Sequence, residues 1–90
     1  MRYPYSMSED DIERGKLKFR ETTRRLGPSA RLELRLLGGG KYHAIFSMGG
    51  KTSSIEMDEG EFADFATNVG VGARITGDIK AALREIGALV

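Results

Sequence analysis

The sequence offers two groups of residues for acid–base or metal chemistry, its single histidine and one dense run of carboxylates. A catalytic histidine needs a nucleophile and an orienting acid, and several serines follow His43 along the chain. Carboxylates can bind a hard cation or transfer protons, and the run consists of Asp58, Glu59, Glu61 and Asp64. However, His43 faces outward on an expected strand without an evident partner set, and helix capping accounts for three of the four carboxylates. We therefore expect no metal site and no enzymatic activity.

A glycine-rich string at Gly49–Thr52 (GGKT) resembles the end of a phosphate-binding loop. In that loop backbone amides surround the phosphates, a lysine neutralises them and a hydroxyl holds magnesium. The pattern also requires a glycine five positions before its last glycine, where Ile45 stands, and a helix that begins at the lysine. The residues that follow, Ser53–Met57, are typical of a strand instead. Gly70–Gly72 lacks the third glycine of a dinucleotide signature, so we expect no nucleotide and no other cofactor.

Length and composition indicate a single globular domain and exclude several other classes of protein. The chain has 90 residues, of which 40% are apolar and 30% charged, as in an ordinary globular domain. We interpret residues 1–90 as one domain, with an N-terminal arm over residues 1–7 and an apolar tail over residues 88–90. The absence of cysteine excludes a disulfide framework and a thiolate metal site. Since no apolar run has the length of a membrane span or a secretion signal, we expect a cytoplasmic protein that binds no membrane.

The first periodic segment, residues 9–26, predicts a helix. Small and apolar residues recur there at helical spacing and form one stripe, Ile12, Gly15, Phe19, Thr22 and Leu26. Ser6–Glu9 has the spacing of a capping box, and Gly27-Pro28 ends the segment. Residues 17–23 also alternate in the manner of a strand, which is the alternative interpretation.

The middle of the chain predicts an antiparallel meander of three strands. Leu32, Leu34 and Leu36 alternate with charged residues, which is typical of a half-buried strand. Glycines at 38–40 and at 49–50 mark two turns, so residues 41–48 and 51–57 form the next two strands. The apolar face of the second strand consists of Tyr42, Ala44, Phe46 and Met48.

Two further helices are expected to cover that sheet. Asp58 and Glu61 have capping-box spacing ahead of an apolar stripe, which consists of Phe62, Phe65, Ala66 and Val69. Gly70–Gly72 should end this helix, and Thr76 should begin a last helix that stops at Gly87. The buried side of the last helix consists of Ile79, Ala82, Leu83 and Ile86. The expected fold class is α+β, a three-stranded antiparallel β-meander packed against helices in the order α-β-β-β-α-α.

Charge is divided unevenly along the chain. The first 51 residues contain eleven Lys and Arg against six Asp and Glu, whereas the remainder contains three against seven. The first half is therefore cationic and the second anionic, which suits electrostatic steering toward a partner with patterned charge. The residues that we expect to contact this partner are Lys16, Lys18, Arg20, Arg24, Arg25, Arg31, Arg35 and Lys41.

Two functions are compatible with these features. The first is a small non-enzymatic protein-binding module that regulates or inhibits a larger partner, in which an exposed sheet edge could also join a second sheet or form a homodimer. In size and composition alone, the chain resembles phage-encoded inhibitors such as anti-CRISPR proteins. The alternative is a nucleic-acid-binding domain that uses the basic first helix and the adjoining strands. Tyr42 and Phe46 share the face assigned to the core, so they would not both be free to stack on bases.

The order of elements from Ser8 to about Gly70 is similar to that of the double-stranded-RNA-binding domain. That family begins its final helix with lysines that contact phosphates across a groove. The corresponding residues here, Asp58–Glu61, carry the opposite charge. The resemblance therefore transfers neither the function nor any site residue to this chain.

Overall fold

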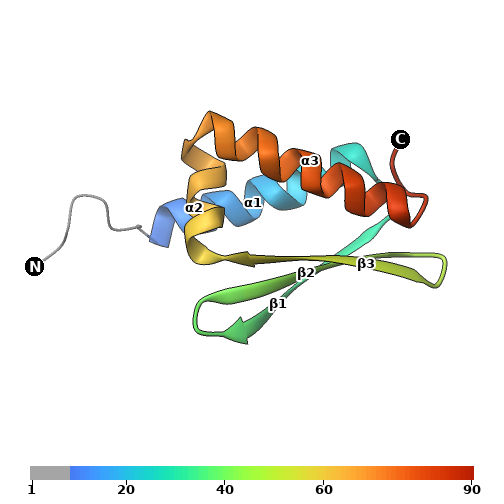
Figure 1. Ribbon diagram of the computed structural model, residues 1–90, viewed down its shortest axis with the longest axis horizontal. Helices are drawn as coiled ribbons and strands as arrows, with labels where there is room; N and C mark the ends of the chain where they lie inside the picture. The colour runs from blue at the N-terminus through green and yellow to red at the C-terminus, as the bar shows by residue number, and fades with distance from the viewer. Residues whose placement is uncertain (1–8) are drawn as a thin grey trace, which may run out of the picture.

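A computed structural model describes residues 9–90 and confirms the α+β fold (Figure 1). The elements are α1 (Glu9–Leu26), β1 (Arg31–Gly38), β2 (Lys41–Met48), β3 (Lys51–Asp58), α2 (Glu59–Thr67) and α3 (Val69–Glu85). The strands form one antiparallel sheet in the order β1-β2-β3, and the helices lie on one of its faces. The expected N-terminal arm and the serines of the first capping box lie outside the described residues.

The first segment is a helix and not a strand. Its buried side contains Ile12, Gly15, Phe19 and Thr22, as the helical spacing predicted, whereas Leu17 is 56% exposed on the opposite side. The buried hydroxyl of Thr23 donates to the carbonyl of Phe19 at 2.9 Å, so burial leaves it no unpaired donor.

Successive side chains along each strand point to opposite faces of the sheet, and this determines which of them reach the core. Phe46, Ala44 and Met57 are buried beneath the helices, and their neighbours in sequence point to the opposite face. The expected turns are confirmed, because Gly49 and Gly50 have φ angles of 60° and 82°, which side chains rarely adopt. Strand β1 differs from the expectation at its end, where Leu36 is 59% exposed.

Four phenylalanine rings hold the helices on the sheet. Phe19 of α1 lies 6.0 Å from Phe46 of β2 and 5.7 Å and 6.1 Å from Phe62 and Phe65 of α2, between ring centroids. Gly15 allows the close approach of α1 to α2, because a Cβ atom at that position would lie 1.7 Å from the carbonyl oxygen of Phe62. These contacts fix α1 above the sheet.

The boundary between the last two helices differs from the prediction. Helix α2 begins with the expected capping box at Asp58 but ends at Thr67, and α3 begins at Val69 instead of near Thr76. The reason is Asn68, whose side chain accepts the backbone N–H of Val71 at 3.0 Å and caps α3.

The first turn of α3 therefore contains the glycines that were expected to end the preceding helix. Val69 is 90% exposed and takes no part in the apolar stripe of α2. Ile79, Ala82, Leu83 and Ile86 are buried, as predicted, and Gly87 follows the helix with a φ angle of 75°. Of the apolar tail, Ala88 is buried and Val90 is 83% exposed.

Candidate functional site

The structure distributes the eight basic residues expected at a partner interface over three surfaces. The first is the flank of α1 that faces β1 and β2, with Lys16, Arg20 and Arg24. The second is the flank toward α2, with Lys18, and the third is the face of the sheet away from the helices. Residues 31, 35 and 41 alternate with helix-facing residues and lie on that third surface. The basic residues thus form no single face.

Helical spacing explains how α1 divides its cations. Lys16, Arg20 and Arg24 follow one another at four-residue intervals, which places them in a row along one side of the helix. Lys18 and Arg25 are seven residues apart and share a different row. The basic residues of this helix therefore lie on two flanks.

Both lysines of α1 make contacts within the chain. The ammonium of Lys16 donates to the Tyr42 hydroxyl at 2.7 Å and to Glu13 at 3.2 Å, and it lies 4.4 Å from the centre of the Tyr42 ring. Partial burial lowers the pKa of Lys16, but the hydrogen bonds to Tyr42 and Glu13 raise it by more, so the net shift is upward. Lys18 donates to the carbonyl of Phe65 at 2.9 Å and lies over its ring. These two cations stabilise the packing of α1.

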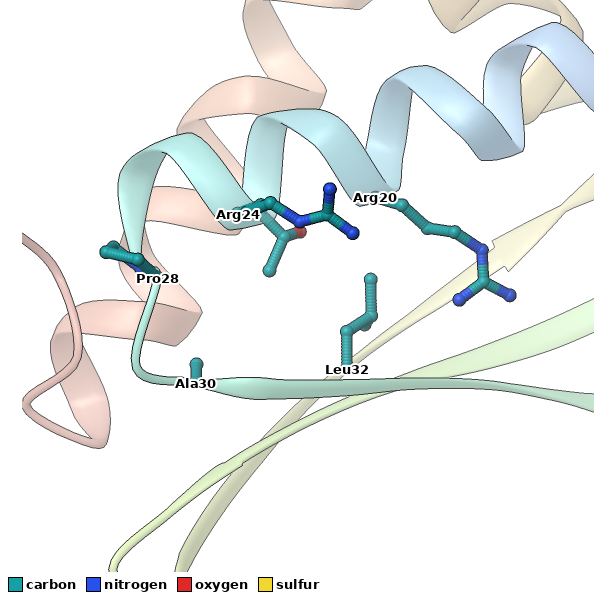
Figure 2. Close-up of a pocket in the computed structure, with 6 residues that line it drawn as sticks. Arg20, Arg24, Pro28, Ala30 and Leu32 are labelled. Atoms are coloured by element: carbon teal, nitrogen blue, oxygen red, sulfur yellow. The ribbon is translucent and has the colours of Figure 1, made fainter.

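Arg20 and Arg24 differ from the lysines because they have no ion pair or hydrogen bond among residues 9–90. Both extend from α1 over the beginning of β1 (Figure 2). They border a groove of about 190 Å³, which is lined by Arg20, Thr23, Arg24, Pro28, Ala30 and Leu32. We call it the α1–β1 groove. Two guanidinium groups without a partner among residues 9–90 therefore lie beside the apolar side chains of Pro28, Ala30 and Leu32.

The face of the sheet away from the helices carries mixed charge. Arg35 forms an ion pair with Glu33 at 3.2 Å, and the strand register sets Arg35, His43 and Glu56 in one row across the sheet. Ser53 points to the opposite side, where its hydroxyl donates to Glu85 at 2.7 Å. The structure therefore brings a carboxylate beside His43 but separates Ser53 from it.

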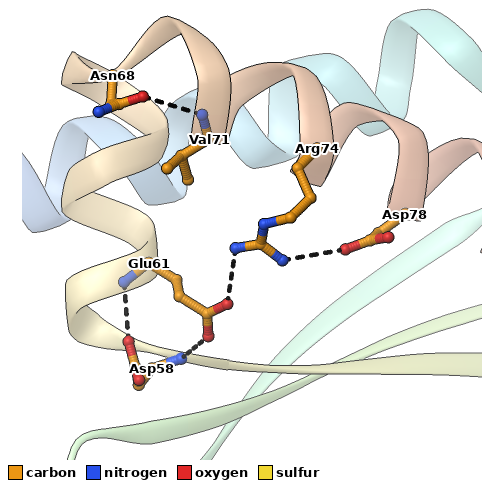
Figure 3. Close-up of polar contacts among 6 residues, drawn as sticks. All are labelled: Asp58, Glu61, Asn68, Val71, Arg74 and Asp78. Atoms are coloured by element: carbon orange, nitrogen blue, oxygen red, sulfur yellow. Dashed lines mark hydrogen bonds and ion pairs between the residues drawn. The ribbon is translucent and has the colours of Figure 1, made fainter.

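Two of the four clustered carboxylates, Asp58 and Glu61, form the capping box of α2 (Figure 3). Asp58 accepts the backbone N–H of Glu61 at 2.8 Å, and the Glu61 side chain accepts the N–H of Asp58 at 3.0 Å. The other oxygen of Glu61 pairs with Arg74 at 3.1 Å, which in turn contacts Asp78. Within residues 9–90 no group of three or more histidines and acids could hold a metal ion.

Charge is polarised along α1. Its first turn contains Glu9, Asp10 and Asp11, and a recess at that end is lined in part by Glu9, Glu13 and Glu59. Its last turn contains Arg24 and Arg25, beside the α1–β1 groove. Within the cationic first half of the chain, this helix therefore has an acidic beginning and a basic end. Sequence reasoning missed the groove, although the four-residue spacing from Lys16 to Arg24 was a signal for a cationic row.

Comparison with known proteins adds no assignment. No protein-family model, curated protein or solved structure matches the chain. Across residues 9–90, none of the helices has the length and apolar character needed to cross a membrane.

Proposed function

We propose that this protein is a small non-enzymatic protein-binding module that regulates or inhibits a larger cytoplasmic protein by holding an acidic segment of it in the α1–β1 groove. The observation that carries the proposal is the pair of arginines, Arg20 and Arg24, which have no partner among residues 9–90 and border an apolar floor. Arg35, by comparison, is already paired with Glu33.

The chemistry of the groove suits carboxylates flanked by apolar side chains. A guanidinium group presents a planar set of donors that matches a carboxylate and binds it through two parallel hydrogen bonds. Each such bond contributes about 1.5–3 kcal/mol when it involves charged groups. An apolar side chain of the partner would cover Leu32 and Ala30, which supply the floor between the arginines and β1.

The polarity of α1 favours one orientation of an acidic partner. The acidic first turn, Glu9 to Asp11, repels carboxylates, whereas the basic last turn attracts them. An acidic segment would therefore approach the groove from the C-terminal end of α1. Weakening of association by salt follows from the same arrangement.

Nucleic-acid binding is supported by the same arginines but not by the aromatic residues. All four phenylalanines are fully buried. Tyr42 packs edge-on against Phe62, with 5.4 Å between ring centroids, and accepts a hydrogen bond from Lys16. Among residues 9–90, the half-buried imidazole of His43 is therefore the only ring left for bases to stack on. For this reason we favour a protein partner.

The test is affinity capture from the source cell with two matched variants. Arg20→Glu/Arg24→Glu reverses the charge of the groove, and Lys80→Glu/Arg84→Glu makes the same change at the same spacing on α3, where both cations are exposed. We expect the wild type and the α3 variant to retain one stoichiometric protein, and the groove variant to retain at least tenfold less.

Three results would contradict the proposal. These are capture of no protein by the wild type, equal capture by the groove variant, and binding to mixed DNA and RNA that falls steeply with salt while no protein is retained. The last result would establish the nucleic-acid alternative.

A further inference from the structure

Strand β1 is an edge strand with an unusual amount of exposed apolar surface. Leu36 and Leu37 are 59% and 51% exposed, and Leu32 and Leu34 are only partly buried beneath the helices. The other edge of the sheet, β3, is polar along most of its length and packs beside α3, where Ser53 donates to Glu85. An unpaired edge with apolar side chains is a template for another strand.

We propose that a second copy of this chain pairs with that edge, so that the two β1 strands run antiparallel about a two-fold axis at Leu34. The two sheets then join into one sheet of six strands, and Leu36 of the second copy lies opposite Leu32 of the first. The inference is independent of the acidic partner, because it rests on the sequence and exposure of β1 alone.

The charge pattern and the extent of β1 together specify this register. Directly opposite residues must face the same side of a sheet, so the two-fold axis passes through a residue. An axis at Glu33 places Glu33 opposite its own copy, and an axis at Arg35 places Arg35 opposite its own copy. An axis at Leu34 sets Glu33 opposite Arg35 twice. An axis at Leu32 also opposes unlike charges, Arg31 and Glu33, but it pairs only residues 31–33 of β1, whereas the axis at Leu34 pairs residues 31–37. Opposite charges in such cross-strand pairs attract, and like charges repel.

The apolar residues fit the same register. The stretch Leu32–Leu36 reads LELRL, so each leucine meets a leucine of the second copy on the helix-facing side. The irregularity in the pairing of β1 with β2 falls between Leu36 and Gly38, at the margin of the paired stretch. Because Leu32 lines the α1–β1 groove, Leu36 of the second copy would extend the floor of that groove.

The experiment measures self-association of the purified full chain by sedimentation equilibrium, from about 1 µM to about 1 mM, because small interfaces dissociate in this range. Four forms are compared with the wild type. They are Glu33→Arg, Arg35→Glu, the double exchange of both, and Lys80→Glu as a control for net charge. We expect the wild type, the double exchange and the control to form dimers, and each single variant to do so at least about tenfold more weakly.

A mixture of the two single variants makes the test specific for the register. Glu33→Arg places cations at both positions 33 and 35, and Arg35→Glu places anions at both, so the two variants should form a heterodimer more tightly than either self-associates. Circular dichroism confirms that each variant is folded. Three results would each overturn the inference. The first is a wild type that is monomeric over this range, the second is a dimer that the single substitutions leave unaffected, and the third is a failure of both the mixture and the double exchange to associate.

Discussion

Replacement of Gly15 by alanine tests the packing that holds α1 in place. A Cβ atom there would lie 1.7 Å from the carbonyl oxygen of Phe62 and 2.4 Å from its carbonyl carbon. A carbon and an oxygen normally stay about 3.3 Å apart, so α1 and α2 would have to separate by more than about 1.5 Å. Backbone atoms cannot rotate away as a flexible side chain can.

The expected effect is destabilisation. Forcing an extra atom into a packed interface costs about 1–3 kcal/mol, and the backbone contact places this site at the upper end. Alanine also favours the helix over glycine by about 1 kcal/mol, which offsets part of the cost. The net loss is about 2 kcal/mol, or a decrease in Tm of about 10 °C for a domain of this size.

Gly77 provides the matched control. It lies within α3, and a Cβ atom at that position meets no atom within 4 Å. Gly77→Ala should therefore raise the free energy of unfolding by about 0.5–1 kcal/mol. Thermal and urea unfolding of both variants measure the two changes. If Gly15→Ala is as stable as the wild type, or if both substitutions shift Tm in the same direction, the inferred contact between α1 and α2 is wrong.

Four further substitutions have defined outcomes in urea unfolding. Folding raises the pKa of Lys16, so its stabilising contribution is complete below pH 10.5 and is lost as the pH rises above that value. Lys16→Met should then destabilise equally at pH values from about 6 to about 9 and by less in stronger alkali; a constant difference at every pH would contradict this. Gly50→Val should cost about 1–2 kcal/mol because φ is positive there, whereas Gly49→Asn should cost less than about 1 kcal/mol. Asp58→Ala removes the helix cap and should cost about 1 kcal/mol, and no loss would show the cap to be dispensable.

The fold could be predicted from the sequence largely because the hydrophobic periods are distinct. Alternation in residues 31–57 and helical spacing around Phe19 each point to one element, and the structure confirms both. The boundary between α2 and α3 could not be predicted in this way. The segment Gly70–Gly72 suggested a loop, because glycine has a weak helix propensity. The hydrogen bond from Val71 to the side chain of Asn68 caps α3 at this point and outweighs that propensity.

The candidate site was predicted less completely than the fold. The sequence identified the basic residues but not their distribution over three surfaces. That distribution, and the role of each residue, depends on which side chains lie near it in the folded chain. Lys16 meets Tyr42, Lys18 meets Phe65, and Arg35 meets Glu33, whereas Arg20 meets open space beside β1. For the two lysines of α1, the contacts that occupy them are with residues far away in sequence, and these could not be predicted from the sequence.

Photocrosslinking in the source cell tests the α1–β1 groove most directly. Pro28 is exposed and lines the groove, so Pro28→p-benzoylphenylalanine would place a reactive ketone beside Arg24 without removing either arginine. Val69 is 90% exposed at the start of α3 and serves as the control position. We predict that the probe at position 28 crosslinks one protein through an acidic segment, and that the probe at position 69 does not. Equal crosslinking from both positions, or adducts to nucleic acid alone from position 28, would contradict the assignment of this groove to an acidic protein partner.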